Sequence, residues 1–192
     1  MECPKTMPLD DESRLTAAVR DFFIAQNAAE LRASVAKLPP NWRDERLHDA
    51  DWEQTEFAFN RLFVGPMALE APPYASVYLE DEPQVMGKTT MLVRSVYEMI
   101  GLVSPWKNTL PDDHISLELD AALALHRMLH AATPSVRGQL QELRVFFLEE
   151  HVQVWVPRFC ARIEAAPSVT PVLLCMAAAL RQWLGTSIAR QG

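Results

Sequence analysis

The chain has 192 residues, of which 49% are hydrophobic and 22% charged, and its net charge at pH 7 is -7. This composition supplies enough apolar material for a packed core and argues against wholesale disorder. The acidity lies in residues 1–104, which carry 10 Lys and Arg against 17 Asp and Glu, so a basic peptide suits the chain better than nucleic acid. An acidic surface that serves only solubility is the alternative.

The cysteines and the chain start indicate a cytoplasmic protein. Cys3, Cys160 and Cys175 have no C-x-x-C spacing, which disfavours a disulfide framework or a zinc knot and favours a reducing compartment. The N-terminal residues lack the basic start and apolar run of a signal peptide. The most apolar stretch, 169–180, is shorter than a membrane span and is followed by Arg181.

Three helices are predicted before residue 65. Acids at 10–12 suit the start of the first, because carboxylates stabilise the positive end of a helix dipole. The second covers 28–38, and the third covers 51–64 and stops at Gly65. Residues 66–87 have no helical period and contain four prolines, so we expect an ordered loop that carries Tyr74, Val77 and Tyr78.

The next helix is expected to begin at Thr89 or Thr90, as its cap, and to end at Gly101. A linker over 104–111 follows, and Asp112 is expected to start a strong helix. One face of that helix carries Ile115, Leu119, Ala122, Leu123, His126 and Leu129.

Three further helices are predicted after it. Pro134 opens the first, whose inward residues are expected to be Val136, Leu140, Leu143 and Phe147. The others cover 152–165 and 168–184, and Trp155 is expected to be a core aromatic. No segment shows sustained strand alternation, so the fold class is all-α, with helical halves at 1–104 and 112–192 joined by a hinge at 105–111.

Known catalytic motifs are missing. Gly87-Lys88-Thr89 is similar to the end of a phosphate-binding loop, but Glu82 stands where that motif needs glycine, so at most weak nucleotide binding remains open. The chain has no G-x-S-x-G and no H-E-x-x-H. The sequence therefore favours a binding protein over an enzyme.

One dense polar cluster, Asp112-Asp113-His114, follows the linker and has three interpretations. The carboxylates could cap the helix. Asp113, His114 and Glu118 could form the metal site of a helical hydrolase, since His114 and Glu118 share a helix face. The cluster could also hold a bound peptide.

The other histidines do not complete that metal site in the sequence. His126 and His130 lie roughly 18–24 Å farther along the helix at 1.5 Å per residue, and they are expected to be packed or surface residues. His151 could approach from another helix, but nothing in the sequence indicates it.

Five segments together resemble the TorD/DmsD/NarJ family of redox-enzyme maturation chaperones. They are FNRLFVGP (59–66), PPYASVYL (72–79), VMGKTT (85–90), PDDHISLEL (111–119) and FLEEHVQVWVPRF (147–159). The resemblance implies a TorD-like, all-helical cytoplasmic chaperone without its own cofactor. It further implies binding of the twin-arginine signal peptide, or the body, of a molybdopterin oxidoreductase subunit, with export delayed until cofactor insertion.

Carried over by position, the resemblance implies a set of peptide-binding residues. They are Tyr74, Ser76, Tyr78, Gly87, Asp112, Asp113 and His114. The chain departs from the family pattern twice: Tyr74 stands where Trp is common, and Leu110 stands where an acid often precedes the proline. The identity of the client and the choice between a monomer and a domain-swapped dimer stay open.

Two measurements separate these interpretations. A stoichiometric metal would favour the hydrolase, because the chaperone interpretation predicts none. Replacing Asp113 and His114 by alanine is expected to weaken client-peptide binding without loss of helicity.

Overall fold

The computed structural model describes residues 10–82, 87–103 and 109–189. These residues form nine α-helices, two short 3₁₀-helices and two π-helices, with no strand. The α-helices are α1 (Asp11–Phe23), α2 (Ala28–Ala36), α3 (Trp52–Phe59), α4 (Ser76–Leu79), α5 (Lys88–Met99), α6 (Ile115–Ala131), α7 (Pro134–Val145), α8 (Gln153–Glu164) and α9 (Pro171–Ala189). The 3₁₀-helices are η1 (Pro40–Trp42) and η2 (Glu45–Leu47), and the π-helices are η3 (Asn60–Val64) and η4 (Phe146–Val152). The prediction of an all-α fold is confirmed.

Side-chain caps start the first three α-helices. Asp10, Asn27 and Asp51 each accept a hydrogen bond from a backbone amide three residues later, which satisfies an otherwise free donor. Gly65 ends η3 with a φ of 100°, a conformation that glycine adopts without a Cβ clash. The predicted helices at the N-terminal end are therefore confirmed, with η3 continuing α3 up to the expected stop.

Two expectations for residues 66–101 are wrong. Residues 76–79 form the one-turn helix α4, because Val77, Tyr78 and Leu79 turn back against α8 and α5 instead of forming an irregular loop. Neither Thr89 nor Thr90 caps α5, which begins at Lys88 after Gly87. Both threonines lie inside its first turn and are buried. The predicted end at Gly101 is confirmed.

Several predictions concern residues outside the described ranges. These residues are the N-terminal segment with Cys3, the motif residues at 85–86 and the hinge residues at 105–108. The division into halves at 1–104 and 112–192 stays a prediction. The described part of the chain has one core cluster to which both regions contribute.

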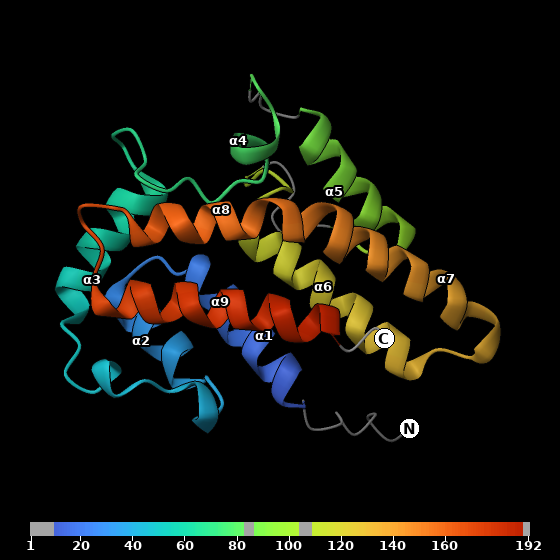
Figure 1. The fold of residues 1–192 in the computed structure, drawn as a ribbon, viewed down its shortest axis with the longest axis horizontal. Coiled ribbons are helices and arrows are strands. Elements are labelled where there is room, and N and C mark those ends of the chain that lie inside the picture. Colours follow the sequence, from blue (N-terminus) through green and yellow to red (C-terminus); the bar gives the residue numbers. More distant parts are fainter. Residues whose placement is uncertain (1–9, 83–86, 104–108, 190–192) are drawn as a thin grey trace.

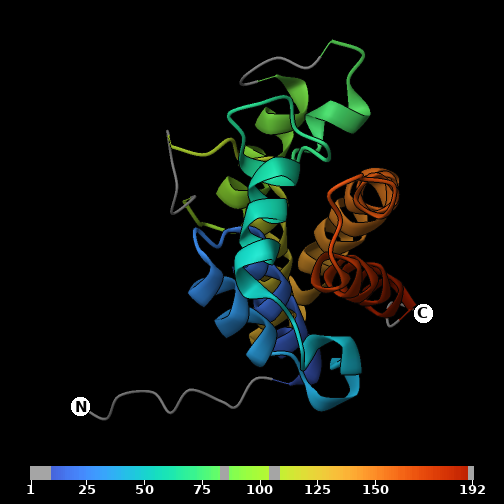
Figure 2. The ribbon, with the colours of Figure 1, turned by 90° about the vertical axis from the view of Figure 1, so that its left-hand side faces the viewer.

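Helices from both ends of the chain pack together. α1, α2 and α3 lie side by side, α8 packs along α9, and α6 packs against α1 (Figures 1 and 2). An aromatic cluster, with neighbouring ring centroids 5.0–5.8 Å apart, joins α1, α3, η3 and α8. Its members are Phe22, Phe23, Phe59, Phe63 and Phe159. Because all five are buried, this cluster fixes the position of η3 against α8.

The C-terminal helices follow the predicted pattern with two corrections. Leu140 and Phe147 are buried, but Val136 is 45% exposed because it lies in the first turn of α7, at the surface. The last helix is longer than expected, and its 19 residues are long and apolar enough to cross a membrane by length and composition alone. Within this helix, 56% of the 18-residue apolar window is buried inside the fold, as in a core helix. Cys160 and Cys175 are free and buried, as predicted.

Candidate functional site

The start of α6 is fastened to the segment that precedes α4. Tyr74 and His114 form an isolated antiparallel bridge. The amide of Ala75 donates to the carbonyl of Asp113 at 3.0 Å, and the amide of Ile115 donates to that of Pro73 at 2.9 Å. The two segments that carry most of the predicted peptide-binding residues are thus brought together, although they are about 40 residues apart in sequence.

Asp113 is the centre of this junction. Its carboxylate is buried and accepts hydrogen bonds from the amide of Ser76 at 3.0 Å and from the hydroxyl of Thr90 at 2.9 Å. One side chain therefore joins α4, α5 and α6. Charged acceptors with several donors can be buried without large cost, because the donors replace water.

Asp112 and Asp113 do not cap α6, which corrects that interpretation. The cap is His114, whose Nδ1 accepts a hydrogen bond from the amide of Ser116 at 3.2 Å. The ring also meets that of Tyr74 edge to face, with centroids 5.2 Å apart. Burial lowers the pKa of His114 to about 4, although Asp113 opposes the shift, so the imidazole is neutral at pH 7.

Asp112 joins α5 to the same junction. It is 1% exposed, and its Oδ2 accepts a hydrogen bond from Nε of Arg94 at 2.6 Å. Its other oxygen, Oδ1, is buried without a hydrogen-bond partner among the described residues, as is the hydroxyl of Ser116. A buried acceptor without a donor is costly, so these two atoms are the points where a further polar group would be most favourable.

Glu118 forms a second buried polar group one turn farther along α6. Its carboxylate is 2.7 Å from Nε2 of His151 and accepts from the indole of Trp155 at 2.9 Å. Burial raises the pKa of Glu118. Burial alone would lower the pKa of His151, but the charge and hydrogen bond of Glu118 raise it above its usual value. The three side chains connect α6 to η4 and α8.

Trp155, Arg94 and Thr90 are residues whose place in the site the sequence interpretation missed. His151, which the sequence left as a possible neighbour from another helix, does reach Glu118. His151 and Trp155 stand four residues apart, which places both on one helix face, and this spacing was the available signal. Their partner Glu118 is 33 residues from His151, and no local pattern predicts that pairing.

The predicted hydrolase site is not assembled. Glu118 is engaged by His151 and Trp155, and Nδ1 of His114 is used in capping α6. Among the described residues, the one group with metal-ligand spacing is Asp10, His126 and His130, which contains none of Asp113, His114 and Glu118.

The remaining predicted residues have different positions. Tyr78 stacks on Trp155 at 5.6 Å, and its hydroxyl donates to the carbonyl of Pro72 at 2.9 Å. Gly87 lies at the start of α5, where the amide of Thr89 donates to the carboxylate of Glu80 at 2.8 Å. An acid therefore occupies the place a phosphate would take, which argues against a nucleotide there.

A pocket of about 410 Å³ opens beside the junction. Its lining combines one face of the aromatic cluster with two of the predicted peptide-binding residues. The lining residues are Phe23, Ile24, Ala25, Gln26, Phe59, Asn60, Phe63, Val64, Tyr74, Thr109, Leu110 and His114. Leu110, one of the two residues that depart from the family pattern, is thus part of an apolar wall. Of the predicted peptide-binding residues, only Tyr74 and His114 line the pocket.

A second pocket of about 610 Å³ adjoins the first and shares Asn60 with it. It is lined by Phe57, Asn60, Arg61, Gly65, Pro66, Met67 and Ala68. Three large apolar side chains around η3 are well exposed: Phe57 at 59%, Val64 at 63% and Met67 at 82%. Exposed apolar groups gathered beside pockets are typical of binding surfaces.

Comparisons with known proteins agree on one family. The model of the nitrate reductase delta subunit family matches residues 24–161. The chain is 31% identical over 131 residues to the Tat proofreading chaperone DmsD of Salmonella typhi, covering 68% of this chain and 55% of that protein. It is 31% identical over 123 residues to the chaperone protein TorD of Vibrio cholerae, covering 61% of this chain and 54% of that protein. The matched region thus spans little more than half the length of these relatives.

A solved structure shows the same fold. It is that of a putative redox enzyme maturation protein from Archaeoglobus fulgidus, with a TM-score of 0.56 and 20% sequence identity. The match covers 96% of this chain and 99% of the other, so the likeness extends over the whole helical arrangement.

Proposed function

Because this chain belongs to the TorD/DmsD/NarJ family of redox-enzyme maturation chaperones, we propose that it is a chaperone, not an enzyme, and that its client is a molybdopterin oxidoreductase subunit. It binds the client's twin-arginine signal peptide, the body of the client or both. Binding assists cofactor insertion and delays export until the client has folded.

The pocket between the aromatic cluster and the α6 junction is the observation that carries this proposal. It is apolar on the side of Phe23, Phe59 and Phe63 and has polar groups at His114 and Thr109. A twin-arginine signal peptide has two guanidinium groups followed by an apolar stretch. The aromatic wall and the exposed residues around η3 suit the apolar stretch, which would lie across the two adjoining pockets.

The buried acids support the pocket indirectly. Asp113 holds Ser76 and Thr90, and Asp112 holds Arg94, so in this structure they position Tyr74 and His114 and do not face solvent. The orphan Oδ1 of Asp112 is the acceptor best suited to a guanidinium N–H, and because it is buried in this structure, a local rearrangement has to expose it first. The acidic N-terminal region supplies the longer-range attraction.

The rest of the proposal concerns the setting. The chaperone acts in the cytoplasm, because the client must be met before export, and it needs no cofactor of its own. It works as a monomer or as a domain-swapped dimer, a choice that light scattering of the purified chain decides.

Titration of the chain with a fluorescent twin-arginine peptide tests the proposal. Val64→Asp places a charge on the apolar rim and is expected to weaken binding at least about tenfold, since burial of one such side chain contributes about 1.5 kcal/mol or more. Val136→Asp is the matched control, because Val136 is also an exposed helical valine but lies in α7, away from both pockets.

Equal loss of affinity in both variants, or no loss in either, would contradict the proposed groove. This pair is sharper than replacing Asp113 and His114, because that double change also removes the contacts that hold α4 and α5 to α6. A second titration with the client body lacking its signal peptide separates the two modes of binding.

A further inference from the structure

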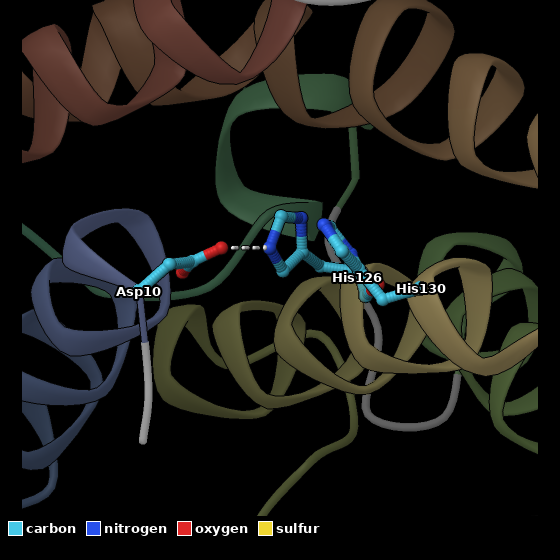
Figure 3. Close-up of side chains that lie close together, drawn as sticks. All are labelled: Asp10, His126 and His130. Atoms are coloured by element: carbon cyan, nitrogen blue, oxygen red, sulfur yellow. Dashed lines mark hydrogen bonds and ion pairs between the residues drawn. The ribbon is translucent and has the colours of Figure 1, made fainter. Parts of the chain in front are cut away.

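The far end of α6 carries a group of three potential metal ligands. His126 and His130 are four residues apart on α6, and Asp10 caps the neighbouring helix α1 (Figure 3). Nε2 of His126 is 2.9 Å from Oδ2 of Asp10, and the rings of the two histidines have centroids 4.4 Å apart. One ligand atom from each residue lies within 4.8 Å of the others.

The second atoms of these side chains are held in ways that suit ligands. Nδ1–H of His130 donates to the backbone carbonyl of His126 at 2.9 Å, which leaves the lone pair of the neutral ring on Nε2. Nδ1 of His126 faces Glu12 at 3.9 Å. Metal-bound histidines commonly donate their other N–H to a carbonyl or carboxylate, as His130 does. At 3.9 Å the contact of His126 with Glu12 is electrostatic and is not a hydrogen bond.

Asp10 can cap α1 and bind an ion at the same time. Its Oδ1 accepts from the amide of Ser13 at 2.7 Å, whereas Oδ2 points to His126. The side chain is 45% exposed, and that of His126 is 14% exposed, so an ion has access from solvent. His130 is exposed as well.

From this arrangement we propose that Asp10, His126 and His130 form a binding site for a divalent transition-metal ion of the zinc class, which fastens the start of α1 to the end of α6. Two imidazoles and one carboxylate are ligands that Zn²⁺ accepts, whereas Mg²⁺ and Ca²⁺ prefer oxygen ligands alone. Three protein ligands leave the fourth tetrahedral position to water or an external donor.

This site differs from the metal centre that the sequence suggested for a hydrolase. It lies at the opposite end of α6 from His114 and shares no residue with the pocket of about 410 Å³ beside the junction. Stoichiometric metal in the purified protein would therefore not by itself support the hydrolase interpretation, because the ion could be bound by Asp10, His126 and His130.

The test uses the full chain, stripped of metal with a chelator and titrated with zinc chloride by calorimetry. His130→Ala removes an exposed ligand, and Asp10→Asn removes the charge while Asn still caps α1. Each is expected to lower zinc affinity by more than about tenfold, because even the outer partners of metal ligands contribute 10- to 100-fold. His48→Ala, an exposed histidine on another segment, is expected to change nothing.

A second measurement follows the midpoint of thermal unfolding. Zinc at 100 times its dissociation constant is expected to raise the midpoint of the wild type by about 5–10 °C, and magnesium is expected to leave it unchanged. Failure of zinc to bind, or equal zinc affinity in the wild type and His130→Ala, would overturn the proposal. Neither result would affect the peptide-binding proposal, which the Val64 variant tests.

Discussion

The two ends of α6 bring together the same kinds of side chain in opposite environments. At the first end, Asp113, His114 and Glu118 are at most 5% exposed. Asp113 and Glu118 are held by groups from other helices, and His114 accepts from Ser116 of its own helix and packs against Tyr74. At the second end, Asp10 and His126 meet at the surface, with side chains 45% and 14% exposed.

Burial explains why these similar groups differ in role. An enclosed carboxylate must have its oxygens satisfied, so the first end has become a structural junction that positions the pocket. The carboxylate of Asp10 is partly exposed, so its Oδ2 can exchange the contact with His126 for an ion that enters from solvent. The residue types alone do not distinguish a junction from a ligand site.

The largest expected effect comes from the buried end. Glu118→Ala removes the partner of His151 and Trp155 and leaves a buried histidine without its carboxylate. Breaking a buried ion pair on one side typically costs about 3–5 kcal/mol. Urea unfolding followed by circular dichroism measures that loss.

Glu150→Ala is the matched control for this change. Glu150 is exposed on η4, close in sequence to His151, so its loss is expected to alter stability by no more than about 0.5 kcal/mol. If the two variants unfolded at the same urea concentration, the buried pair would contribute nothing and the contrast between the ends of α6 would fail.

Much of the fold follows from local patterns in the sequence. Asp10 and Asp51 predicted their helix starts, and Gly65 and Gly101 their ends, because capping depends on residues within one turn. The prediction failed at Thr89 and Thr90. The reason is tertiary: the hydroxyl of Thr90 is used by Asp113, which comes from a segment 23 residues later.

The site was predictable only in part. The resemblance brought Tyr74 and His114 to attention, and both line the pocket. It could not show that Asp112 and Asp113 are enclosed, because their donors Arg94, Ser76 and Thr90 lie on other segments. Likewise, Asp10 and His126 are 116 residues apart, so no spacing rule connects them.

A smaller effect is expected from pH, again at the buried end. The folded state holds the pKa of His114 at about 4, below the ordinary value of 6.5, so it binds this proton less well than the unfolded state does. Stability from neutral His114 is therefore complete above about pH 6.5 and is lost as the pH falls toward 4. The loss between pH 8 and pH 5 is about 2 kcal/mol.

His114→Asn isolates this contribution, because Asn still caps a helix but does not titrate. Urea unfolding at pH 5 and pH 8 is expected to show a difference between the wild type and the variant that shrinks at the lower pH. His151, whose raised pKa acts in the opposite direction, is present in both proteins and cancels. A difference that is the same at both pH values would mean that the junction tolerates a charged imidazole.

The smallest effect is expected at the exposed end, where Asp10→Asn without metal should change the free energy of unfolding by less than about 1 kcal/mol. Asn replaces Asp as a cap with little loss, and an exposed pair such as Asp10 with His126 contributes little because water and salt screen it. Urea unfolding in the presence of a chelator measures this value. A loss as large as that of Glu118→Ala would show that the exposed end is also a structural junction. A small loss means that Oδ2 of Asp10 can exchange its contact with His126 for an ion at little cost, while Oδ1 stays on the amide of Ser13.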